Sequence, residues 1–225
     1  MMKKLLLFVG IIFILQGCIA MSGGEDETMN KQLFVAVEAK DFDAVRELLE
    51  ESVDINAQDE QGRTAVMIAT YANDVDMVKL LVDAGAIVDI QDDMLNNPFL
   101  YAGAEGYMDI LRLMIAAGAD PTITNRYGGV ALIPASEHGY VEVVEELLTN
   151  TKTDVNHVNN LGWTALLEAI ILNDGSEKQQ DTIRLLIEHG ADVNLADKDG
   201  VMPLAHAREK GFKEIEAILL EAEAK

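Results

Sequence analysis

An alanine that recurs at nearly constant spacing constrains the fold of this chain more than any other feature. It occupies positions 36, 69, 102, 135, 169 and 207, so the intervals are 33, 33, 33, 34 and 38 residues. Two apolar helical patterns separated by a turn surround each alanine. A unit of this length has an apolar face that it cannot bury alone, so neighbouring units must stack and share one elongated core. The sequence therefore predicts a solenoid of about six helix-turn-helix repeats over residues 30–225.

Residues typical of helix ends recur at matching positions in these repeats. A hydroxyl or amide that can cap a helix, or a proline suited to its first turn, begins the first helix at Thr64, Thr164, Asn97-Pro98 and Pro203. A glycine that can adopt the left-handed conformation follows the second helix at Gly85, Gly118 and Gly190. With the loop GADVN from Gly190 to Asn194, the chain resembles the ankyrin-repeat family over about 195 of its 225 residues. The resemblance implies an all-α fold, an ankyrin-repeat solenoid with short β-turn fingers.

Two repeats depart from the common pattern. Repeat four has Val130 at the cap position, Pro134 inside its first helix and Thr151-Lys152-Thr153 where the family has Gly-Ala, so we expect it to be the most distorted unit. Repeat five carries about five extra residues within Asn173 to Gln180. The segment is polar, which favours a solvated surface excursion, although a binding element is the alternative.

The amino terminus has the pattern of an export signal. Lys3 and Lys4 precede an apolar segment, Leu5 to Leu15, that is too short to span a bilayer. The following Leu15-Gln16-Gly17-Cys18 resembles the bacterial lipobox, and Cys18 is the only cysteine. We therefore predict a lipoprotein signal peptide over 1–17, lipidation of Cys18 and a flexible acidic tether over 18–29. The alternative is a free thiol beside a different cleavage site.

The predicted lipid would hold the chain in the bacterial cell envelope, attached to the membrane through that lipid alone. Ile19 follows the cysteine where the family's inner-membrane retention signal has Asp. In a host with an outer membrane, the expected location is therefore the outer membrane, facing the periplasm.

The charge of the chain excludes one class of partner. The formal net charge is −22, from 17 basic and 39 acidic residues. Binding to DNA or RNA rests on clustered Lys and Arg, so no nucleic acid is expected. An acidic surface can steer a basic protein toward itself, and it can equally serve solubility alone.

The sequence contains no recognisable catalytic or metal-binding set. Ser136 and His138 are the nearest Ser/His pair, but residues two apart on a helix face different ways. The four histidines fall at unrelated places in the repeat, and no zinc or calcium spacing occurs. We expect no catalytic residue, no metal and no cofactor, and therefore not an enzyme.

The family resemblance implies that a partner contacts the finger residues and two residues after each marker alanine. These positions include Arg126. Large apolar side chains have no stacking role there and are the first candidates for partner binding, with three acidic residues as a charged rim. The predicted partner-binding residues are Tyr71, Met94, Tyr127, Leu161, Trp163, Ile171 and Leu172, with Glu60, Asp93 and Glu105.

Surface anchoring, a binding architecture and strong acidity together indicate a membrane-anchored protein–protein interaction module of the envelope. We expect a monomer whose partner is another protein with a basic surface. One hypothesis is an immunity or inhibitor protein that neutralises a secreted toxin. The alternative is a resident adaptor or assembly scaffold without an inhibitory role.

Overall fold

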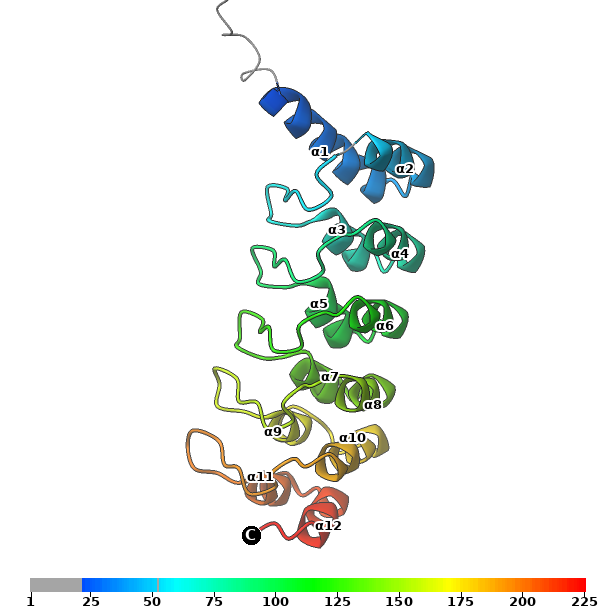
Figure 1. The fold of residues 1–225 in the computed structure, drawn as a ribbon. Coiled ribbons are helices and arrows are strands. Elements are labelled where there is room, and N and C mark those ends of the chain that lie inside the picture. The colour runs from blue at the N-terminus through cyan, green and yellow to red at the C-terminus, as the bar shows by residue number, and fades with distance from the viewer. Residues whose placement is uncertain (1–21, 52) are drawn as a thin grey trace, which may run out of the picture.

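The computed structural model describes residues 22–51 and 53–225. Its helices follow one another in six antiparallel pairs that stack into a single elongated solenoid (Figure 1). The described residues contain no strand, which confirms the predicted all-α class. The helices are α1 (Ser22–Glu38), α2 (Phe42–Glu50), α3 (Ala65–Tyr71), α4 (Val75–Asp83), α5 (Pro98–Glu105), α6 (Met108–Ala116), α7 (Leu132–His138), α8 (Val141–Asn150), α9 (Ala165–Ile171), α10 (Glu177–Glu188), α11 (Pro203–Lys210) and α12 (Lys213–Glu221).

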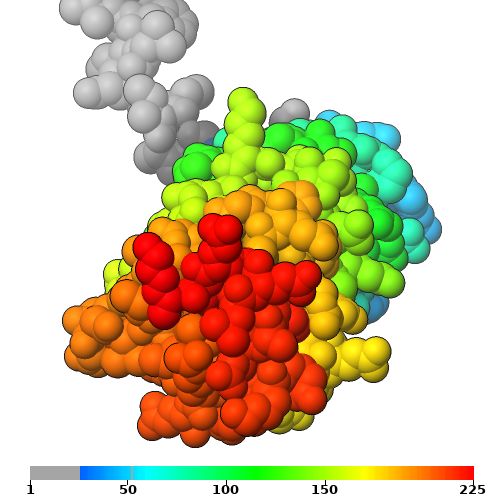
Figure 2. Space-filling view, turned by 90° about the horizontal axis from the view of Figure 1, so that it is seen from below, coloured from blue at the N-terminus to red at the C-terminus, as the bar shows by residue number. Residues whose placement is uncertain are grey.

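The first helix of each pair is the inner layer of the solenoid. From α3 onward these inner helices lie between the projecting finger loops on one side and the outer helices on the other (Figure 1). Their apolar residues and those of the outer helices form one continuous core that runs from Leu33 in the first repeat to Leu219 in the last. Figure 2 looks onto the last repeat, where α12 covers the end of this stack.

Five finger loops separate the repeats within the described residues, at 59–63, 92–96, 125–129, 159–163 and 197–201. In the third, the Asn125 N–H donates to the Gly129 carbonyl at 2.9 Å, and the Gly128 N–H donates to the Asn125 carbonyl at 2.8 Å. The Asn125 side-chain oxygen also accepts from the Tyr127 and Gly129 N–H groups. Each finger is therefore a short β-turn whose first Asp or Asn holds it closed, as predicted.

A second set of Asp and Asn side chains fixes the register between repeats. The Asn56 side-chain oxygen accepts from the Ile87 N–H at 2.8 Å, and the Asp89 carboxylate accepts from the Asp120 N–H at 3.0 Å. Asn156 does the same for the Asp192 N–H at 2.7 Å. Each bond ties the loop after one outer helix to the equivalent loop of the next repeat.

Repeat four differs from its neighbours at its helix ends. Helix α7 begins at Leu132, and Ala131 before it provides no side-chain cap, whereas Thr64, Asn97 and Thr164 cap the equivalent helices. At the end of α8 the Thr151 hydroxyl donates to the Leu147 carbonyl at 2.6 Å and replaces the usual glycine turn. The departures of the sequence thus change the caps, while both helices keep their place in the stack.

The first helix of the solenoid begins earlier in the sequence than predicted. Helix α1 begins at Ser22, inside the segment 18–29 that the sequence predicted to be a flexible tether before a domain starting at residue 30. Acidic residues favour a helix amino terminus, and Lys31 pairs with Glu27 at 2.6 Å one turn further along. The signal peptide 1–17 and Cys18 lie outside the described residues. Among the helices of the described part, none combines the length and apolarity that crossing a membrane would need.

The extra residues of repeat five are also placed differently from the prediction. Only part of the segment is solvated: Asp174, Glu177 and Lys178 are exposed, whereas α10 already begins at Glu177 and Gln179 is fully buried. The polar composition did not show that Asn173, Lys178 and Gln179 bond to the neighbouring repeat.

Candidate functional site

The tips of the second, third and fourth fingers carry exposed side chains that contribute nothing to the core. The exposed fractions are 46% for Met94, 46% for Leu95, 53% for Tyr127 and 41% for Leu161. With the exposed Arg126, these five residues form what we call the finger-tip stripe. The fingers project from the same side of the solenoid (Figure 1), so the stripe is a single surface.

Contacts between neighbouring fingers hold the stripe in place. The Asn160 N–H donates to the Tyr127 carbonyl at 2.9 Å, which joins the third and fourth fingers. A Cβ atom on Gly128, where φ is +73°, would lie 2.5 Å from the Asn160 side-chain oxygen. The glycine at this point allows the close approach, so the third and fourth fingers are held at a fixed spacing.

Arg126 is arranged over its neighbours and makes no ion pair. Its guanidinium carbon lies 4.8 Å from the centre of the Tyr127 ring, and one of its terminal nitrogens lies 3.4 Å from the sulfur of Met94. No carboxylate among the described residues forms an ion pair with it. By contrast, Arg63 beside the first finger is paired with both Asp59 and Glu38.

Leu95 occupies a strained position at the tip of the second finger. Its φ is +57°, and the equivalent residues of the other four fingers are Gly62, Gly128, Gly162 and Gly200. The left-handed region costs a side-chain-bearing residue roughly 1 kcal/mol. The sequence prediction missed Leu95, although an alignment of the five fingers shows that it stands where glycine is the rule.

Tyr71 was a predicted contact residue, and the structure gives it a role within the fold. Its hydroxyl donates to the Asp92 carboxylate at 2.5 Å and accepts from the Asn96 amide at 3.2 Å, while its ring packs edge-on against Tyr101 at 4.5 Å. Burial and the Asp92 carboxylate raise the pKa of Tyr71 to about 12. Tyr71 therefore anchors the base of the second finger and is half-buried.

The other predicted residues fall into three groups. Trp163 and Ile171 are half-buried, which leaves part of each side chain for a partner. Leu172 is 47% exposed, but it lies at the end of α9 rather than on a finger. The acidic residues Glu60, Asp93 and Glu105 are all exposed, so they can form a charged rim.

A buried carboxyl group lies beneath the fourth finger. Glu168 on α9 is only 6% exposed and accepts a hydrogen bond of 2.7 Å from the Asn159 side-chain amide. Asn159 also accepts from the Leu161 and Trp163 N–H groups, so it organises the finger. Burial, with the nearby Glu137, raises the pKa of Glu168 to about 7. The sequence prediction did not identify this group.

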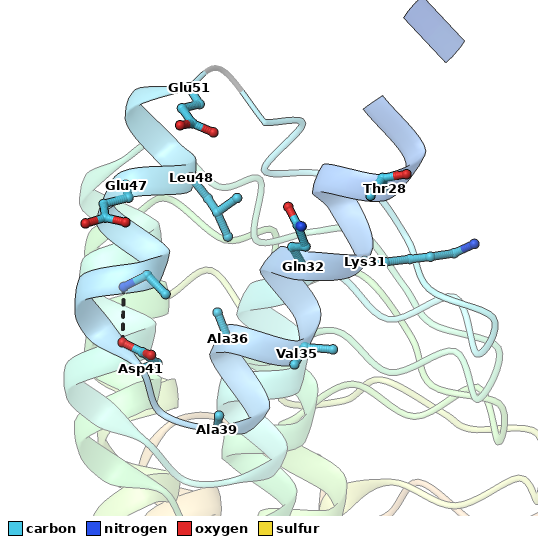
Figure 3. A pocket seen from close by; sticks show the side chains of 11 residues that line it. Thr28, Lys31, Gln32, Val35, Ala36, Ala39, Asp41, Glu47, Leu48 and Glu51 are labelled. Carbon is cyan, nitrogen blue, oxygen red and sulfur yellow. Dashed lines mark hydrogen bonds between the residues drawn. The ribbon is translucent and has the colours of Figure 1, made fainter. Parts of the chain in front are cut away.

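A hollow of about 560 Å³ lies in the first repeat, between α1 and α2 (Figure 3). Apolar residues such as Ala36, Ala39 and Leu48 line it together with polar and charged ones such as Lys31 and Glu47, and Val35 is 64% exposed. This is the face of the first repeat on which a preceding repeat would stack. Its apolar residues are explained by their place on this stacking face, so the hollow is a weaker candidate for a binding site than the finger-tip stripe.

Ser136 and His138 do not come together. Ser136 is fully buried in α7, whereas His138 is exposed with its ring 5.4 Å from that of Tyr140. No cluster of three or more possible metal ligands occurs among the residues that the structure describes.

Comparison with known proteins supports the assignment of the repeats. The family described as Ankyrin repeats (3 copies) matches residues 33–125, 101–197 and 132–225. The putative ankyrin repeat protein YahD of Escherichia coli K12 is 55% identical over 82 residues, which are 36% of this chain and 41% of that protein. The chain therefore matches less than half the length of this curated relative.

Several solved structures match over most of the chain. An ankyrin repeat domain of Acinetobacter baumannii, ABAYE2397, is 51% identical with a TM-score of 0.84, covering 86% of this chain and 98% of that one. A chain in the complex of the predatory endopeptidase Bd0816 with the immunity protein Bd3460, from Bdellovibrio bacteriovorus, is 27% identical. Its TM-score is 0.71, covering 85% of this chain and 97% of that one.

Proposed function

The chain belongs to the ankyrin-repeat family of protein–protein interaction modules, and we propose that it binds its partner protein through the finger-tip stripe. The observation that carries the proposal is the row of exposed apolar side chains on three successive fingers. Exposed apolar groups that cluster on a rigid surface commonly mark an interaction site. Tyr and Arg are also the residue types that most often dominate binding energy.

The strain at Leu95 supports the same surface. A glycine would adopt the positive φ of +57° without this strain, as glycines do in the other fingers, yet the chain places an exposed leucine at this point. Residues with backbone strain of this kind cluster at functional sites. The leucine extends the apolar surface of the stripe beside Met94.

The proposed role is an inhibitory one, in which the protein captures an exported enzyme or toxin in the cell envelope. A structure that matches 85% of this chain comes from a complex between an immunity protein and an endopeptidase. The net charge of −22 suits a basic partner. Lipidation of Cys18, which lies outside the described residues, would keep the protein where such a partner acts.

Site-specific photocrosslinking tests this proposal in the cells that make the protein. A benzophenone amino acid replaces Tyr127 or Leu161 in the stripe, or Thr149 on the outer helix α8 as a matched exposed control. We expect one partner to crosslink from both stripe positions and not from the control. The crosslinked partner is identified by mass spectrometry, and its activity is then measured with and without the added protein.

The outcomes separate the parts of the proposal. Crosslinking from Thr149 alone, or equally from all three positions, would show that the stripe is not the binding surface. A stripe-specific partner whose activity is unaffected would favour the adaptor role over inhibition.

A further inference from the structure

The unpaired guanidinium of Arg126 indicates which chemical group of a partner the stripe can bind. The chain has 39 acidic and 17 basic residues, so an arginine without a carboxylate partner stands out. The four other tip residues of the stripe carry no charge. Arg126 is therefore the only charged group in the stripe, and it lies at the tip of the middle finger of the three.

The surroundings of Arg126 hold it ready for a ligand. The ring of Tyr127 supports the guanidinium at 4.8 Å, and Met94 contacts one terminal nitrogen at 3.4 Å. Stacking of this kind leaves the edge of a guanidinium free, and that edge matches the two oxygens of a carboxylate. These two contacts restrict the side chain before a partner arrives, which lowers the conformational entropy that binding costs.

The acidic residues of the rim favour some anionic ligands of Arg126 over others. Asp93 is exposed on the second finger, Glu105 at the end of α5 and Glu60 on the first finger, and their charges repel extended polyanions such as nucleic acid. A partner that presents one carboxylate surrounded by basic groups can pair the carboxylate with Arg126 and the basic groups with the acidic rim. An apolar side chain next to it would meet Leu95 or Leu161.

We infer that Arg126 is a specificity-determining residue that accepts an Asp or Glu carboxylate of the partner protein, beside an apolar contact and within a basic fringe. This inference rests on the proposed function, because it assumes that the stripe is the binding surface. It goes further in stating that one acidic residue lies at the centre of a partner surface that is otherwise basic.

Selection from a displayed library of random peptides tests the inference before a natural partner is known. The full chain is immobilised in detergent, and binders are screened for loss of affinity on Tyr127→Ala, which selects those that use the stripe. We expect these peptides to share an Asp or Glu next to an apolar residue. Arg126→Gln should weaken their binding by about tenfold or more. The matched control is Lys198→Gln, an exposed cation without an ion pair on the fifth finger, which should have little effect.

A double-mutant cycle separates direct recognition from a merely structural role. The peptide's acidic residue is changed to its amide, and both peptides are measured on the wild type and on Arg126→Gln. Direct pairing predicts that the two changes together cost no more than either alone. Additive losses would show that Arg126 only supports the Tyr127 ring, and would overturn the inference.

Other outcomes distinguish failure of this inference from failure of the proposed function. Peptides that depend on Tyr127 but show no acidic preference would overturn the inference and leave the proposed function intact. If no selected peptide loses affinity on Tyr127→Ala or Leu161→Ala, the stripe is not a binding surface and both fail.

Discussion

The side-chain amide of Gln179 donates a hydrogen bond of 3.0 Å to the backbone carbonyl oxygen of Glu137, near the end of helix α7. Asn173 donates to the same oxygen at 2.8 Å, and Lys178 donates to the His138 carbonyl at 3.1 Å. The last carbonyls of a helix have no partner within it, so these side chains satisfy groups that would otherwise lack one. The extra residues of repeat five thus fasten it to repeat four.

Removing this fastening should destabilise the carboxy-terminal repeats. Gln179→Ala leaves a buried gap and weakens the cap on α7, so the free energy of unfolding should fall by about 2 kcal/mol. The control is Glu188→Ala on the same helix, whose side chain is exposed and should change that free energy by less than about 0.5 kcal/mol. Urea unfolding gives the magnitude, and faster hydrogen exchange confined to repeats four to six gives the location. Equal stability of the two variants would show that the Gln179 bonds contribute little.

The buried Glu168 should make the stability of the protein depend on pH. Its pKa of about 7 exceeds the ordinary value of 4.5, because burial and the repulsion from Glu137 favour the protonated form. The folded chain therefore binds this proton more tightly than the unfolded chain, and the free energy of unfolding falls as pH rises from about 4.5 to about 7.

Glu168→Gln should remove that dependence, because an amide keeps the bond from Asn159 and carries no charge. At pH 8 the variant should be more stable than the wild type by about 1 to 2 kcal/mol, and at pH 4 the difference should be small. Urea unfolding at several pH values measures both curves. Glu137→Gln should weaken the pH dependence only in part, since it removes the repulsion and leaves Glu168 buried. Parallel curves for the wild type and Glu168→Gln would mean that this group titrates normally.

Most of the fold follows from local sequence. The spacing of the marker alanines and the caps at Thr64, Asn97 and Thr164 predicted the helix pairs, and the structure confirms the solenoid and its fingers. The prediction was incomplete at Asn173 to Gln180 because polar residues can bond to a neighbouring repeat as well as to water. Such bonds depend on packing across 36 or more residues, which composition does not reveal.

The site was only partly visible in the sequence. Position within the repeat predicted that Met94, Tyr127 and Leu161 would be surface residues, and their exposure agrees. It could not show that Tyr71 bonds to Asp92, because that contact joins an inner helix to the next finger. Partner binding by these residues remains a prediction.

Cys18→Ser should prevent lipid attachment, because the thiol is the predicted acylation point. The variant should be found either uncleaved or free of the membrane, and the wild type should partition into detergent with an acylated amino terminus. Detergent partitioning and the mass of the mature protein measure both. An unchanged mass and normal membrane retention in the variant would refute the lipoprotein prediction.

Leu95→Gly should separate stability from binding at the finger-tip stripe. A glycine accepts the positive φ of +57° without strain, so the free energy of unfolding should stay within about 1 kcal/mol of the wild type or rise. The same change removes an exposed apolar side chain from the stripe, so affinity for the crosslinked partner should fall by about tenfold. Ile87→Gly is the control, since Ile87 is 52% exposed in a loop away from the fingers. Denaturation and binding are measured on the same preparations. If Leu95→Gly is more stable and binds as tightly as the wild type, the leucine has no role in the stripe, and the strain there needs another cause.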